Sequence, residues 1–310
     1  MSNTTIDDVA KHAQVSRATV SRVLNDNHRV DEKLRERVLE AVRVLGYQPN
    51  HVARRLRAQS STVIGLIISD IQNPYFLSVI RGVEDEAYAN RLSIVLCNSD
   101  EDAAKQQLYL QVMESEHVAG LILVPTSSVD TGGIERLRRV GIPVVLLDRN
   151  VNGLLADVVK VDNVRGAFDA VQHLIDLGYR RIATLAGCSH LSTGSERYRG
   201  YREALASAKI PLNETLVKYG DYKTESGYRL THELMSLPQP PDAIFAANNM
   251  MTLGALRALR ERNIHIPGEI RLVGFDDMPW SGELYSPLTS VSQPTYELGQ
   301  EAVRLLRQRI

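Results

Sequence analysis

The stretch TIDDVAKHAQVSRATVSRVLN, residues 5–25, decides the fold of the N-terminal part of the chain. It holds two short segments whose apolar residues recur at helical spacing. These residues are Ile6, Val9, Ala10 and Ala13 in the first segment and Val20, Val23 and Leu24 in the second. Helices this short are not stable alone, so we expect them to pack against a third helix further along the chain.

Polar residues mark where these three helices begin. Thr5 is followed three residues later by Asp8, which is a capping-box pattern, and Ser16 precedes the second apolar stripe. Asp31 is the expected cap of the third helix, whose apolar residues are Leu34, Val38, Ala41, Val42 and Leu45. Gly46 then supplies the C-terminal stop. We expect Tyr47 to fold back onto the small core, and the polar, basic connector QPNHVARRLRAQSST to follow it.

The composition is that of an ordinary globular protein: 310 residues, of which 44% are hydrophobic and 24% charged. The longest apolar run, TVIGLIIS, has the length of a strand and falls short of the roughly 18 residues that span a membrane. We therefore expect neither a membrane segment nor a secretory leader. Cys97 and Cys188 lie in apolar surroundings, which favours buried free thiols in the cytoplasm over a disulfide.

The net charge of −1 hides an asymmetry. Residues 1–60 contain eleven lysines and arginines against seven aspartates and glutamates, a net charge of +4, which leaves −5 for the rest. A basic head on an acidic body indicates that the head alone meets a polyanion. A solvated basic face with no partner is the alternative.

From Val63 onward, strand-like runs alternate with amphipathic helical segments. The strand-like runs are TVIGLIIS, LSIVLCN, AGLILVP and PVVLLD, then RIATLAG, LVKYGD, AIFAAN, IRLVGF and LTSVSQP. Strands separated by helices predict parallel sheets joined by right-handed crossovers. The number of units favours two doubly wound α/β domains after an N-terminal helix-turn-helix head, and the helix TYELGQEAVRLLRQRI closes the chain.

The exposed face of the second helix suits DNA. Opposite its apolar stripe lie Arg17, Ala18, Ser21 and Arg22. An arginine here can donate two hydrogen bonds to guanine in the major groove, and small neighbours let the helix approach closely. The side chains suited to phosphate oxygens are Thr19, Ser21 and Asn25. A plain solvated surface is the alternative that helical spacing alone leaves open.

The string TIDDVAKHAQVSRATVSRVLN resembles the DNA-binding head of the lactose/galactose repressor (LacI/GalR) family, and VLEAVRVLGYQPNHVARRLR is similar to that family's third helix and hinge. The likeness continues through the body in NPYF, DR at 148–149, VDN at 161–163, GYRRIATLAG, RYRGYREAL, GDY, TLGALRALRERNIHIP, GFDD and PLTSVSQP. It therefore covers practically the whole chain.

The resemblance implies three parts: a helix-turn-helix domain at 1–49, a hinge helix and linker at 50–61, and an effector-binding and dimerisation region at 62–310. Within the last part we expect one subdomain at about 62–161 and 293–310 and a second at about 162–292. Two bodies resembling periplasmic sugar-binding proteins would pair as a homodimer on a near-palindromic operator in double-stranded DNA. The implied DNA-binding residues are Thr5, Ser16, Arg17, Ala18, Thr19, Ser21, Arg22, Asn25, Asn50, Ala53, Arg54 and Leu56.

In the hinge, Leu56 matches the leucine that wedges into the minor groove at the operator centre, beside Ala53. Two departures stand out. Gln14 replaces the usual glycine between the first two helices, which costs around 1 kcal/mol if the position needs positive φ. Arg55 replaces a small polar residue and is expected to add a phosphate contact. A mere linker remains the alternative for the hinge.

Polar residues gather at the ends of the predicted strands, where doubly wound sheets bind ligands. Matched to family motifs, the implied effector-binding residues are Tyr75, Phe76, Arg149, Asp162, Thr193, Arg197, Tyr222, Asn249 and Asp276. Core packing is the alternative for Phe76, helix capping or turn formation for Asp162 and Asp276. Trp280 is a further candidate for packing against a sugar, with loop or dimer packing as its alternative.

Asn249 stands where many sugar-responsive relatives have aspartate, which weakens a simple sugar-hydroxyl assignment and leaves polyols, sugar acids and a phosphorylated sugar open as effectors. A purine-type corepressor and an exported solute-binding protein are the alternative functions. The resemblance also implies dimerisation through the first subdomain, with Leu77, Ile80 and Val83 as candidates that core packing explains equally well. Relatives usually carry one more strand after the last helix, so we expect an uncovered edge in the second subdomain.

Enzyme motifs are missing from the sequence: no G-x-S-x-G, H-E-x-x-H, Walker lysine or G-x-G-x-x-G pattern occurs, and the histidines lack metal-ligand spacing. Ser189 and His190 are adjacent but do not make a triad. We expect no catalytic residues, no cofactor and no metal. The expected mechanism is a switch in which effector binding rotates one subdomain on the other and changes operator affinity, with induction and corepression both open.

Overall fold

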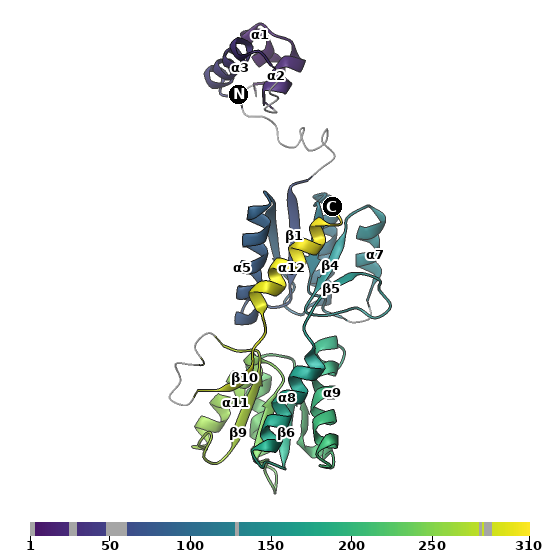
Figure 1. The fold of residues 1–310 in the computed structure, drawn as a ribbon, viewed down its shortest axis with the longest axis vertical. Coiled ribbons are helices and arrows are strands. Elements are labelled where there is room, and N and C mark those ends of the chain that lie inside the picture. The colour runs from purple at the N-terminus through teal and green to yellow at the C-terminus, as the bar shows by residue number, and fades with distance from the viewer. Residues whose placement is uncertain (1–3, 25–29, 48–60, 128–129, 279–280, 282–286) are drawn as a thin grey trace. The chain divides into compact units, whose positions relative to one another are not determined.

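The computed structural model describes residues 4–24, 30–47, 61–127, 130–278, 281 and 287–310. The chain divides into two compact units, Met1–Ser61 and Thr62–Ile310 (Figure 1). We refer to them as the head and the body.

The head contains the three predicted helices, α1 (Ile6–Ala13), α2 (Arg17–Leu24) and α3 (Glu32–Leu45). All three contribute to one small core, whose fully buried side chains are Val9, Ala10, Ala13, Val20, Val23, Val38 and Ala41. Tyr47 packs against this core as predicted.

The predicted helix caps of the head are confirmed. Thr5 and Asp8 form both hydrogen bonds of a capping box at α1. The Ser16 hydroxyl accepts from the Thr19 amide at 3.1 Å, and Asp31 accepts from the amide of Lys33 at 3.0 Å. Gly46 ends α3 in the left-handed conformation.

Gln14 lies between α1 and α2 with φ 50° and ψ 48°, so this position does need the left-handed conformation. The guanidinium of Arg37 supports the turn by donating to the carbonyl oxygens of Ala13 at 2.6 Å and Gln14 at 3.3 Å. These bonds compensate in part for a conformation that an L-residue other than glycine, asparagine or aspartate seldom adopts.

We expect Gln14→Gly to stabilise the head by about 0.5–1 kcal/mol, because glycine removes the strain and keeps the backbone bonds to Arg37. Hydrogen exchange of head amides in the full chain measures the change. Gln14→Ala is the control, since alanine keeps the strain and should give no gain. Slower exchange in the alanine variant than in the glycine variant would contradict this account.

The body begins with a five-stranded parallel sheet in the order β2-β1-β3-β4-β5. Its strands are β1 (Val63–Ile68), β2 (Ser93–Asn98), β3 (Gly120–Leu123), β4 (Val144–Leu147) and β5 (Asp157–Val159). The helices on it are α5 (Pro74–Ala89), α6 (Ala103–Ser115), α7 (Gly132–Arg139) and the C-terminal α12 (Thr295–Arg307). One core lies between the sheet and α5 with α12, and a second lies between the sheet and α6 with α7.

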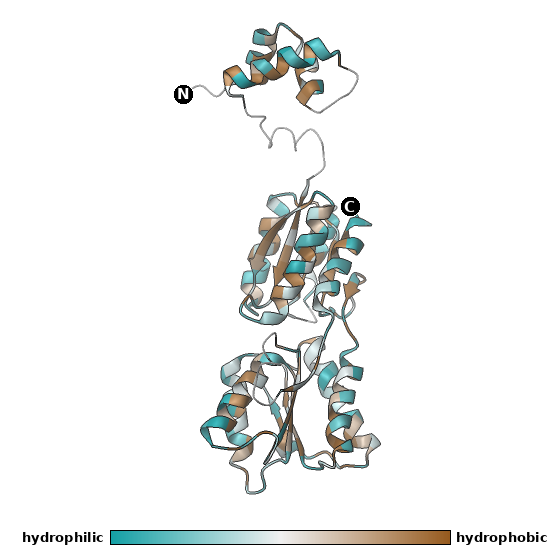
Figure 2. Ribbon diagram, turned by 60° about the vertical axis from the view of Figure 1, so that its left-hand side comes forward, coloured by the Kyte–Doolittle hydropathy of each residue, from teal (hydrophilic) through white to brown (hydrophobic). Residues whose placement is uncertain are grey.

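The second sheet repeats this topology with the order β10-β9-β8-β6-β7. Its strands are β6 (Ile182–Ala186), β7 (Val217–Tyr219), β8 (Ala243–Ala246), β9 (Arg271–Phe275) and β10 (Thr289–Val291), with the 3-10 helix η1 (Glu214–Leu216) before β7. The helices are α8 (Asn163–Asp176), α9 (Ser192–Ser207), α10 (Thr224–Met235) and α11 (Asn249–Glu261). Figure 2 shows apolar strands between helices whose outer faces are polar, as expected for sheets covered on both sides.

The predicted fold class is therefore confirmed. The body consists of two doubly wound α/β subdomains, one built around each sheet. We call the subdomain of the first sheet the first layer and that of the second sheet the second layer. The chain passes from the first sheet to the second between β5 and α8 and returns between β10 and α12. Gly82 and Gly299 allow α5 and α12 to pack closely, since a Cβ at Gly82 would collide with the Tyr296 carbonyl oxygen.

Three details differ from expectation or go beyond it. β5 was not predicted, because it has only three residues and follows β4 without a helix. Cys97 and Cys188 are free thiols as predicted, but both are partly exposed, so the expected full burial was wrong. None of the helices in the described ranges is long and apolar enough to cross a membrane.

Candidate functional site

The outer face of α2 presents the side chains that the sequence assigned to DNA. Arg17, Ala18 and Arg22 are exposed and Thr19 and Ser21 are partly exposed, while Val20 and Val23 fill the core. The Arg17 guanidinium lies 3.7 Å from the Asp7 carboxylate, and both side chains are mostly exposed. A pair in this setting is weak and screened by salt, so Arg17 is free to turn toward another acceptor.

Three of the predicted DNA-contacting hydroxyls are engaged within the head. The Thr5 hydroxyl donates to Asp8 at 2.7 Å, and the Ser16 hydroxyl both caps α2 and lies 2.9 Å from the Thr19 hydroxyl. These bonds position the start of α1 and α2. The remaining predicted contacts, Asn25, Asn50, Ala53, Arg54 and Leu56, and also Arg55, lie outside the described residues.

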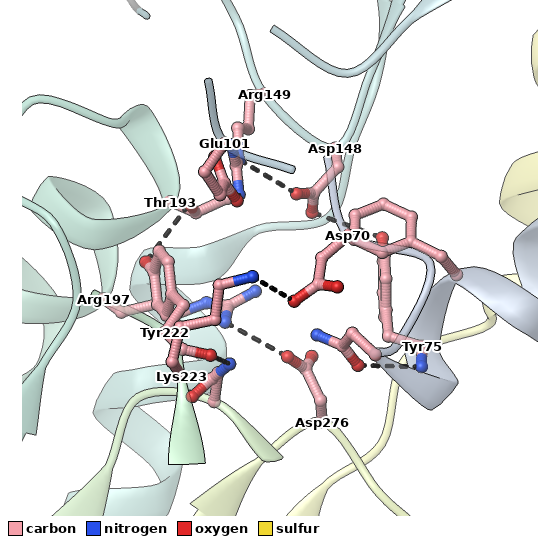
Figure 3. Close-up of a pocket in the computed structure, with 13 residues that line it drawn as sticks. Asp70, Tyr75, Glu101, Asp148, Arg149, Thr193, Arg197, Tyr222, Lys223 and Asp276 are labelled. Carbon is pink, nitrogen blue, oxygen red and sulfur yellow. Dashed lines mark hydrogen bonds and ion pairs between the residues drawn. The ribbon is translucent and has the colours of Figure 1, made fainter. Parts of the chain in front are cut away.

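The body contains a small cavity, with free space of about 30 Å³, at the carboxyl ends of the strands of both sheets (Figure 3). Its position is the one that doubly wound sheets use for ligands. Its lining residues are Asp70, Asn73, Tyr75, Phe76, Glu101, Asp148, Arg149, Thr193, Arg197, Tyr222, Lys223, Asn248 and Asp276.

Three lining residues have a left-handed backbone conformation. Asp148, Tyr222 and Asp276 have φ of 65°, 67° and 70° and directly follow or lie near the ends of β4, β7 and β9. Aspartate tolerates this conformation, whereas tyrosine adopts it mainly where the surrounding structure enforces it. The side chains of all three residues line the cavity (Figure 3).

Arg197 is the most firmly held cation of the cavity. From α9 its guanidinium donates to Asn163 Oδ1 at 2.9 Å and to the Ala247 carbonyl oxygen at 2.7 Å, and it lies 3.3 Å from Asp276 Oδ2. It also stacks 3.8 Å from the centre of the Phe275 ring. Burial is the largest single influence and opposes the charge, but Asp276, Tyr222, Asp148 and Tyr75 together outweigh it and raise the pKa of the guanidinium.

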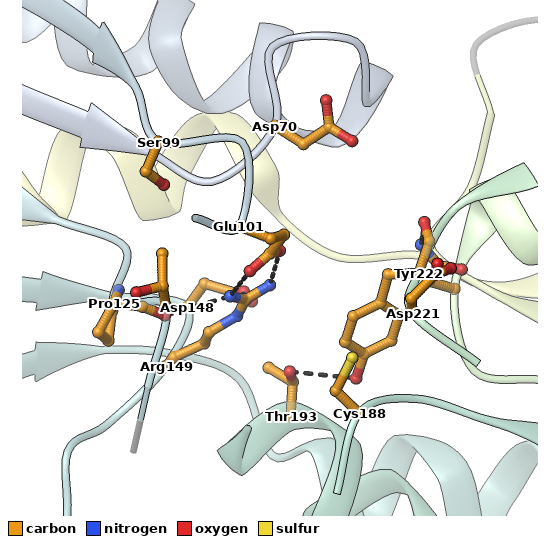
Figure 4. A network of polar contacts seen from close by, with 12 residues as sticks. Asp70, Ser99, Glu101, Pro125, Asp148, Arg149, Cys188, Thr193, Asp221 and Tyr222 are labelled. Carbon is orange, nitrogen blue, oxygen red and sulfur yellow. Dashed lines mark hydrogen bonds and ion pairs between the residues drawn. The ribbon is translucent and has the colours of Figure 1, made fainter. Parts of the chain in front are cut away.

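Arg149 is paired within the first layer. Its guanidinium makes two hydrogen bonds to Glu101, at 2.7 and 2.6 Å, and one to the Pro125 carbonyl oxygen at 3.1 Å (Figure 4). This is the bidentate geometry in which an arginine–carboxylate pair is strongest. Most of the hydrogen-bonding capacity of Arg149 is therefore used inside the protein.

The acidic groups of the cavity are not equally satisfied. The Asp276 carboxylate contacts both Arg197 and the Gln293 side-chain amide. The Asp148 carboxylate accepts from the Tyr75 hydroxyl at 3.2 Å and lies 3.5 Å from Arg149 Nε. Burial raises the pKa of Asp148, and the neighbouring arginines oppose this shift. Asp148 is thus a buried acceptor that has room for a hydroxyl donor.

On the opposite wall, the Tyr222 hydroxyl donates to the Thr193 hydroxyl at 3.2 Å. Asn248 holds this wall in place, because its amide donates to the Tyr222 carbonyl oxygen at 3.1 Å and its oxygen caps α11. The Tyr222 ring offers an apolar face beside the polar groups. A mixture of hydroxyls, carboxylates and an aromatic face is suited to a small polar molecule.

Seven of the nine predicted effector-binding residues line the cavity: Tyr75, Phe76, Arg149, Thr193, Arg197, Tyr222 and Asp276. Phe76 also belongs to the core of the first layer, so both of its interpretations apply. Asp162 does not line the cavity; it is exposed and caps α8 through the Arg165 amide, as its alternative predicted. Trp280 lies outside the described residues.

Asn249 does not line the cavity either. It is fully buried, and its amide donates to Asn73 Oδ1 at 2.9 Å, which links the start of α11 to the start of α5. An aspartate at position 249 would place a negatively charged carboxylate against Asn73 Oδ1, where the amide of Asn249 now donates a hydrogen bond. Asn73 therefore accounts for the amide nitrogen of Asn249, while Asn249 Oδ1 is buried without a hydrogen-bond partner among the described residues.

Glu101 and Lys223 were not predicted from the sequence, and the Arg197 partner Asn163 was included only within the VDN motif. Glu101 reaches Arg149 across 48 positions of sequence, and Lys223 reaches Asp70 across 153. The only local signal is that each follows a predicted strand end. In the described part of the chain, no group of three or more metal-ligating side chains comes together.

Comparisons with known proteins agree with this geometry. Residues 5–50 match the bacterial regulatory proteins of the lacI family, and residues 171–310 match a periplasmic binding protein-like domain. The chain is 37% identical to the catabolite control protein A of Priestia megaterium over 305 residues, 98% of this chain and 92% of that protein.

It is 39% identical to the ribose operon repressor of Halalkalibacterium halodurans over 307 residues, 99% of this chain and 90% of that protein. Among solved structures, a lac repressor dimer bound to operator and the anti-inducer ONPF matches with a TM-score of 0.86 and 28% identity. That match covers 99% of this chain and 92% of the other.

Proposed function

Because this chain belongs to the lacI family of bacterial regulatory proteins, we propose that it represses transcription as a homodimer under the control of a neutral polyhydroxylated effector, a sugar or polyol. Members of the family are DNA-binding transcriptional regulators that respond to small molecules and are not enzymes, as predicted. In this proposal the protein acts in the cytoplasm, where the operator DNA is, and needs no cofactor. The effector class is inferred from the chemistry of the cavity.

The charge balance of the cavity carries the proposal. Each cation faces a carboxylate: Arg149 faces Glu101, Arg197 faces Asp276, and Lys223 faces Asp70. Asp148 is then left as a buried acceptor with a single hydroxyl donor and one distant arginine nitrogen. A hydroxyl-bearing ligand can donate to such carboxylates, whereas a sugar acid or a phosphate would meet them as like charge.

A thermal-shift screen of the full chain tests the effector class with neutral sugars and polyols, sugar acids, phosphorylated sugars and nucleobases. A ligand at 100 times its Kd stabilises the folded protein by about 2.7 kcal/mol. We expect stabilisation by a neutral sugar or polyol. A response confined to acids, phosphates or nucleobases would refute the assignment, and nucleobases would favour a purine-type corepressor.

In the proposed complex, two heads place α2 in successive major grooves of a near-palindromic operator. The exposed face with Arg17, Ala18 and Arg22 supports this placement. The wedge formed by Leu56 of each hinge remains part of the proposal by family resemblance.

We expect Arg17→Ala or Arg22→Ala to weaken operator binding by roughly 1–3 kcal/mol and to relax the preference at one position of each half-site. Fluorescence anisotropy on the operator, its single-base variants and random duplex measures both effects. Arg43→Ala is the matched control, because Arg43 is an exposed arginine of α3 that pairs with Glu40 at 2.6 Å. Equal losses on operator and random DNA for both α2 variants would argue against base contacts.

The proposed dimer surface lies on the first layer of the body. β2 is an edge strand with Val95 and Leu96 exposed, and α5 and α6 lie on either side of it. α5 turns Leu77 and Tyr88 outward, at 57% and 79% exposure. α6 buries Leu110 and Met113 while it exposes Leu108 and Val112 on another face.

A helix that is apolar on two faces requires a second partner besides its own core. The exposed apolar side chains of α5, β2 and α6 are therefore candidates for burial against a partner. A second copy of the chain is the partner that supports two half-sites. Of the three predicted interface residues, Leu77 is exposed and Ile80 half-buried, but Val83 is fully buried in the core and cannot contribute.

A further inference from the structure

Lys223 connects the two layers of the body across the mouth of the cavity. It lies between β7 and α10, in the second layer. Its ammonium group is 2.8 Å from Asp70 Oδ2 and 3.0 Å from Asp100 Oδ1 (Figure 3 shows the bond to Asp70). Asp70 follows β1 and Asp100 follows β2, so both acceptors belong to the first layer.

Both sides of this contact are held by bonds of their own. The Lys223 amide donates to Asp221 Oδ1 at 3.0 Å, and the Lys223 carbonyl oxygen accepts from Ser226 Oγ at 2.9 Å. On the other side, Asp70 Oδ1 accepts from the Gln72 amide at 2.9 Å. The ammonium group therefore bridges two sites that are ordered without it, which lowers the entropy lost when the contact forms.

This pair differs from the other two of the cavity. Arg149 with Glu101 and Arg197 with Asp276 each stay within one layer, so a rotation of the layers leaves them intact. The contacts of Lys223 must break when the layers separate. The Lys223 side chain is 36% exposed and that of Asp70 is 8% exposed, so this contact is shielded more than an ordinary surface pair.

We propose that the ion pairs of Lys223 with Asp70 and Asp100 hold the two layers together before effector binds. They thereby set the fraction of molecules whose body is closed. We call this contact the clasp. Lys223 acts as a positioning residue. In a closed body without the lysine, Asp70 would stay buried without a cation, and separation of the layers would allow water to reach it. Loss of Lys223 therefore favours the open form.

A variant of Asp100 can distinguish a role of Lys223 in closure from direct contact between Lys223 and a ligand. Lys223 lines the cavity, but Asp100 does not, and its side chain is 48% exposed. If the ammonium group merely touched the effector, loss of Asp100 would have little consequence. If Lys223 forms the clasp, Asp100→Asn opens the body in the same direction as Lys223→Met, to a smaller extent.

Cys188 provides a measure of closure that needs no effector. It follows β6 in the second layer, beside Thr193 and Tyr222 (Figure 4). Burial raises the pKa of its thiol to about 11, and Glu101 of the first layer adds to the shift. Because Glu101 belongs to the first layer, opening moves its negative charge away from the thiol and should make Cys188 react faster with a disulfide reagent.

The experiment measures the rate at which DTNB reacts with Cys188 in the full chain carrying Cys97→Ala. We expect Lys223→Met to raise the rate at least about threefold, in keeping with a partly shielded ion pair, and Asp100→Asn to raise it less. The double variant should react no faster than Lys223→Met. High salt should accelerate the parent and leave Lys223→Met unchanged.

Lys105→Met is the matched control. Lys105 Nζ lies 3.9 Å from Asp100 Oδ2, is also about half exposed, and belongs to the same layer as that aspartate. Its loss should leave the rate at the parent value. Parent-like rates in both Lys223→Met and Asp100→Asn, additive effects in the double variant, or an equal effect of Lys105→Met would overturn the clasp.

The link to regulation rests on the proposed function, because it requires the effector to bind in this cavity. The thiol rates do not require it. Altered rates together with no response in the sugar and polyol screen would keep the clasp and refute the effector assignment. Unaltered thiol reaction rates together with a clear response to a sugar or polyol would refute the clasp and support the effector assignment.

Discussion

Leu77→Glu is expected to convert the dimer to monomers and to lower operator affinity at least about 100-fold, because a monomer loses the effective concentration that joins two half-sites. The Leu77 side chain is 57% exposed on α5, so the substitution leaves the core of the body untouched. In an isologous interface each change occurs twice, and two glutamates are brought into a desolvated surface. Sedimentation velocity gives the assembly state, and anisotropy gives the affinity for an operator selected from random duplexes by the parent chain.

Leu177→Glu is the matched control for this experiment. Leu177 follows α8 in the second layer and is 51% exposed, so the change in charge and apolar area is comparable. This variant should remain a dimer with parent affinity. A dimeric Leu77→Glu protein, or equal dissociation of both variants, would show that α5 is not at the interface.

The head was predictable because its signals are local. Thr5, Asp31 and Gly46 act on backbone groups within a few residues, so their roles follow from sequence order alone. The same holds for strands whose apolar runs are buried on both faces. β5 escaped prediction because three residues carry too little pattern. Val83 was ambiguous because helical spacing fixes a face and not what covers it.

The position of the cavity was predictable from the sequence, but the partners of its charged side chains were not. The rule that ligands bind at the carboxyl ends of strands correctly placed Arg149 and Asp276 at the same cavity. It could not show that Glu101 occupies Arg149, or that Asn163, not Asp162, contacts Arg197. These pairings join residues that are far apart in the sequence within each layer, which no local pattern encodes. They also decide the effector class, since a cation that is already paired attracts an anion far less.

Arg197→Ala is expected to weaken effector binding by between about tenfold and 100-fold, because it removes a buried donor and leaves polar groups without partners. Arg197 holds Asn163, the Ala247 carbonyl oxygen and Asp276 together, and these groups join α8, β8 and β9 around the cavity. Without the guanidinium, Asp276 retains only the Gln293 amide among these contacts. The Asp276 carboxylate would then be less firmly held and would accept hydrogen bonds from water. It would no longer be oriented to accept a hydrogen bond from a hydroxyl of the effector.

Titration calorimetry with the sugar or polyol identified in the screen measures this loss, and Arg197→Lys gives a graded comparison. Lysine keeps the charge but cannot donate in a fork to both Asn163 and Ala247, so its affinity should lie between those of the parent and the alanine variant. Operator affinity without effector should stay near the parent value in both, because the head and the exposed α5 surface are unchanged. Thermal denaturation separates a folding defect from a binding defect: a variant that melts near the parent temperature yet binds effector normally would place the effector elsewhere. The order parent, lysine, alanine in affinity, with operator binding retained, is the pattern expected if the Arg197 guanidinium supports the effector site.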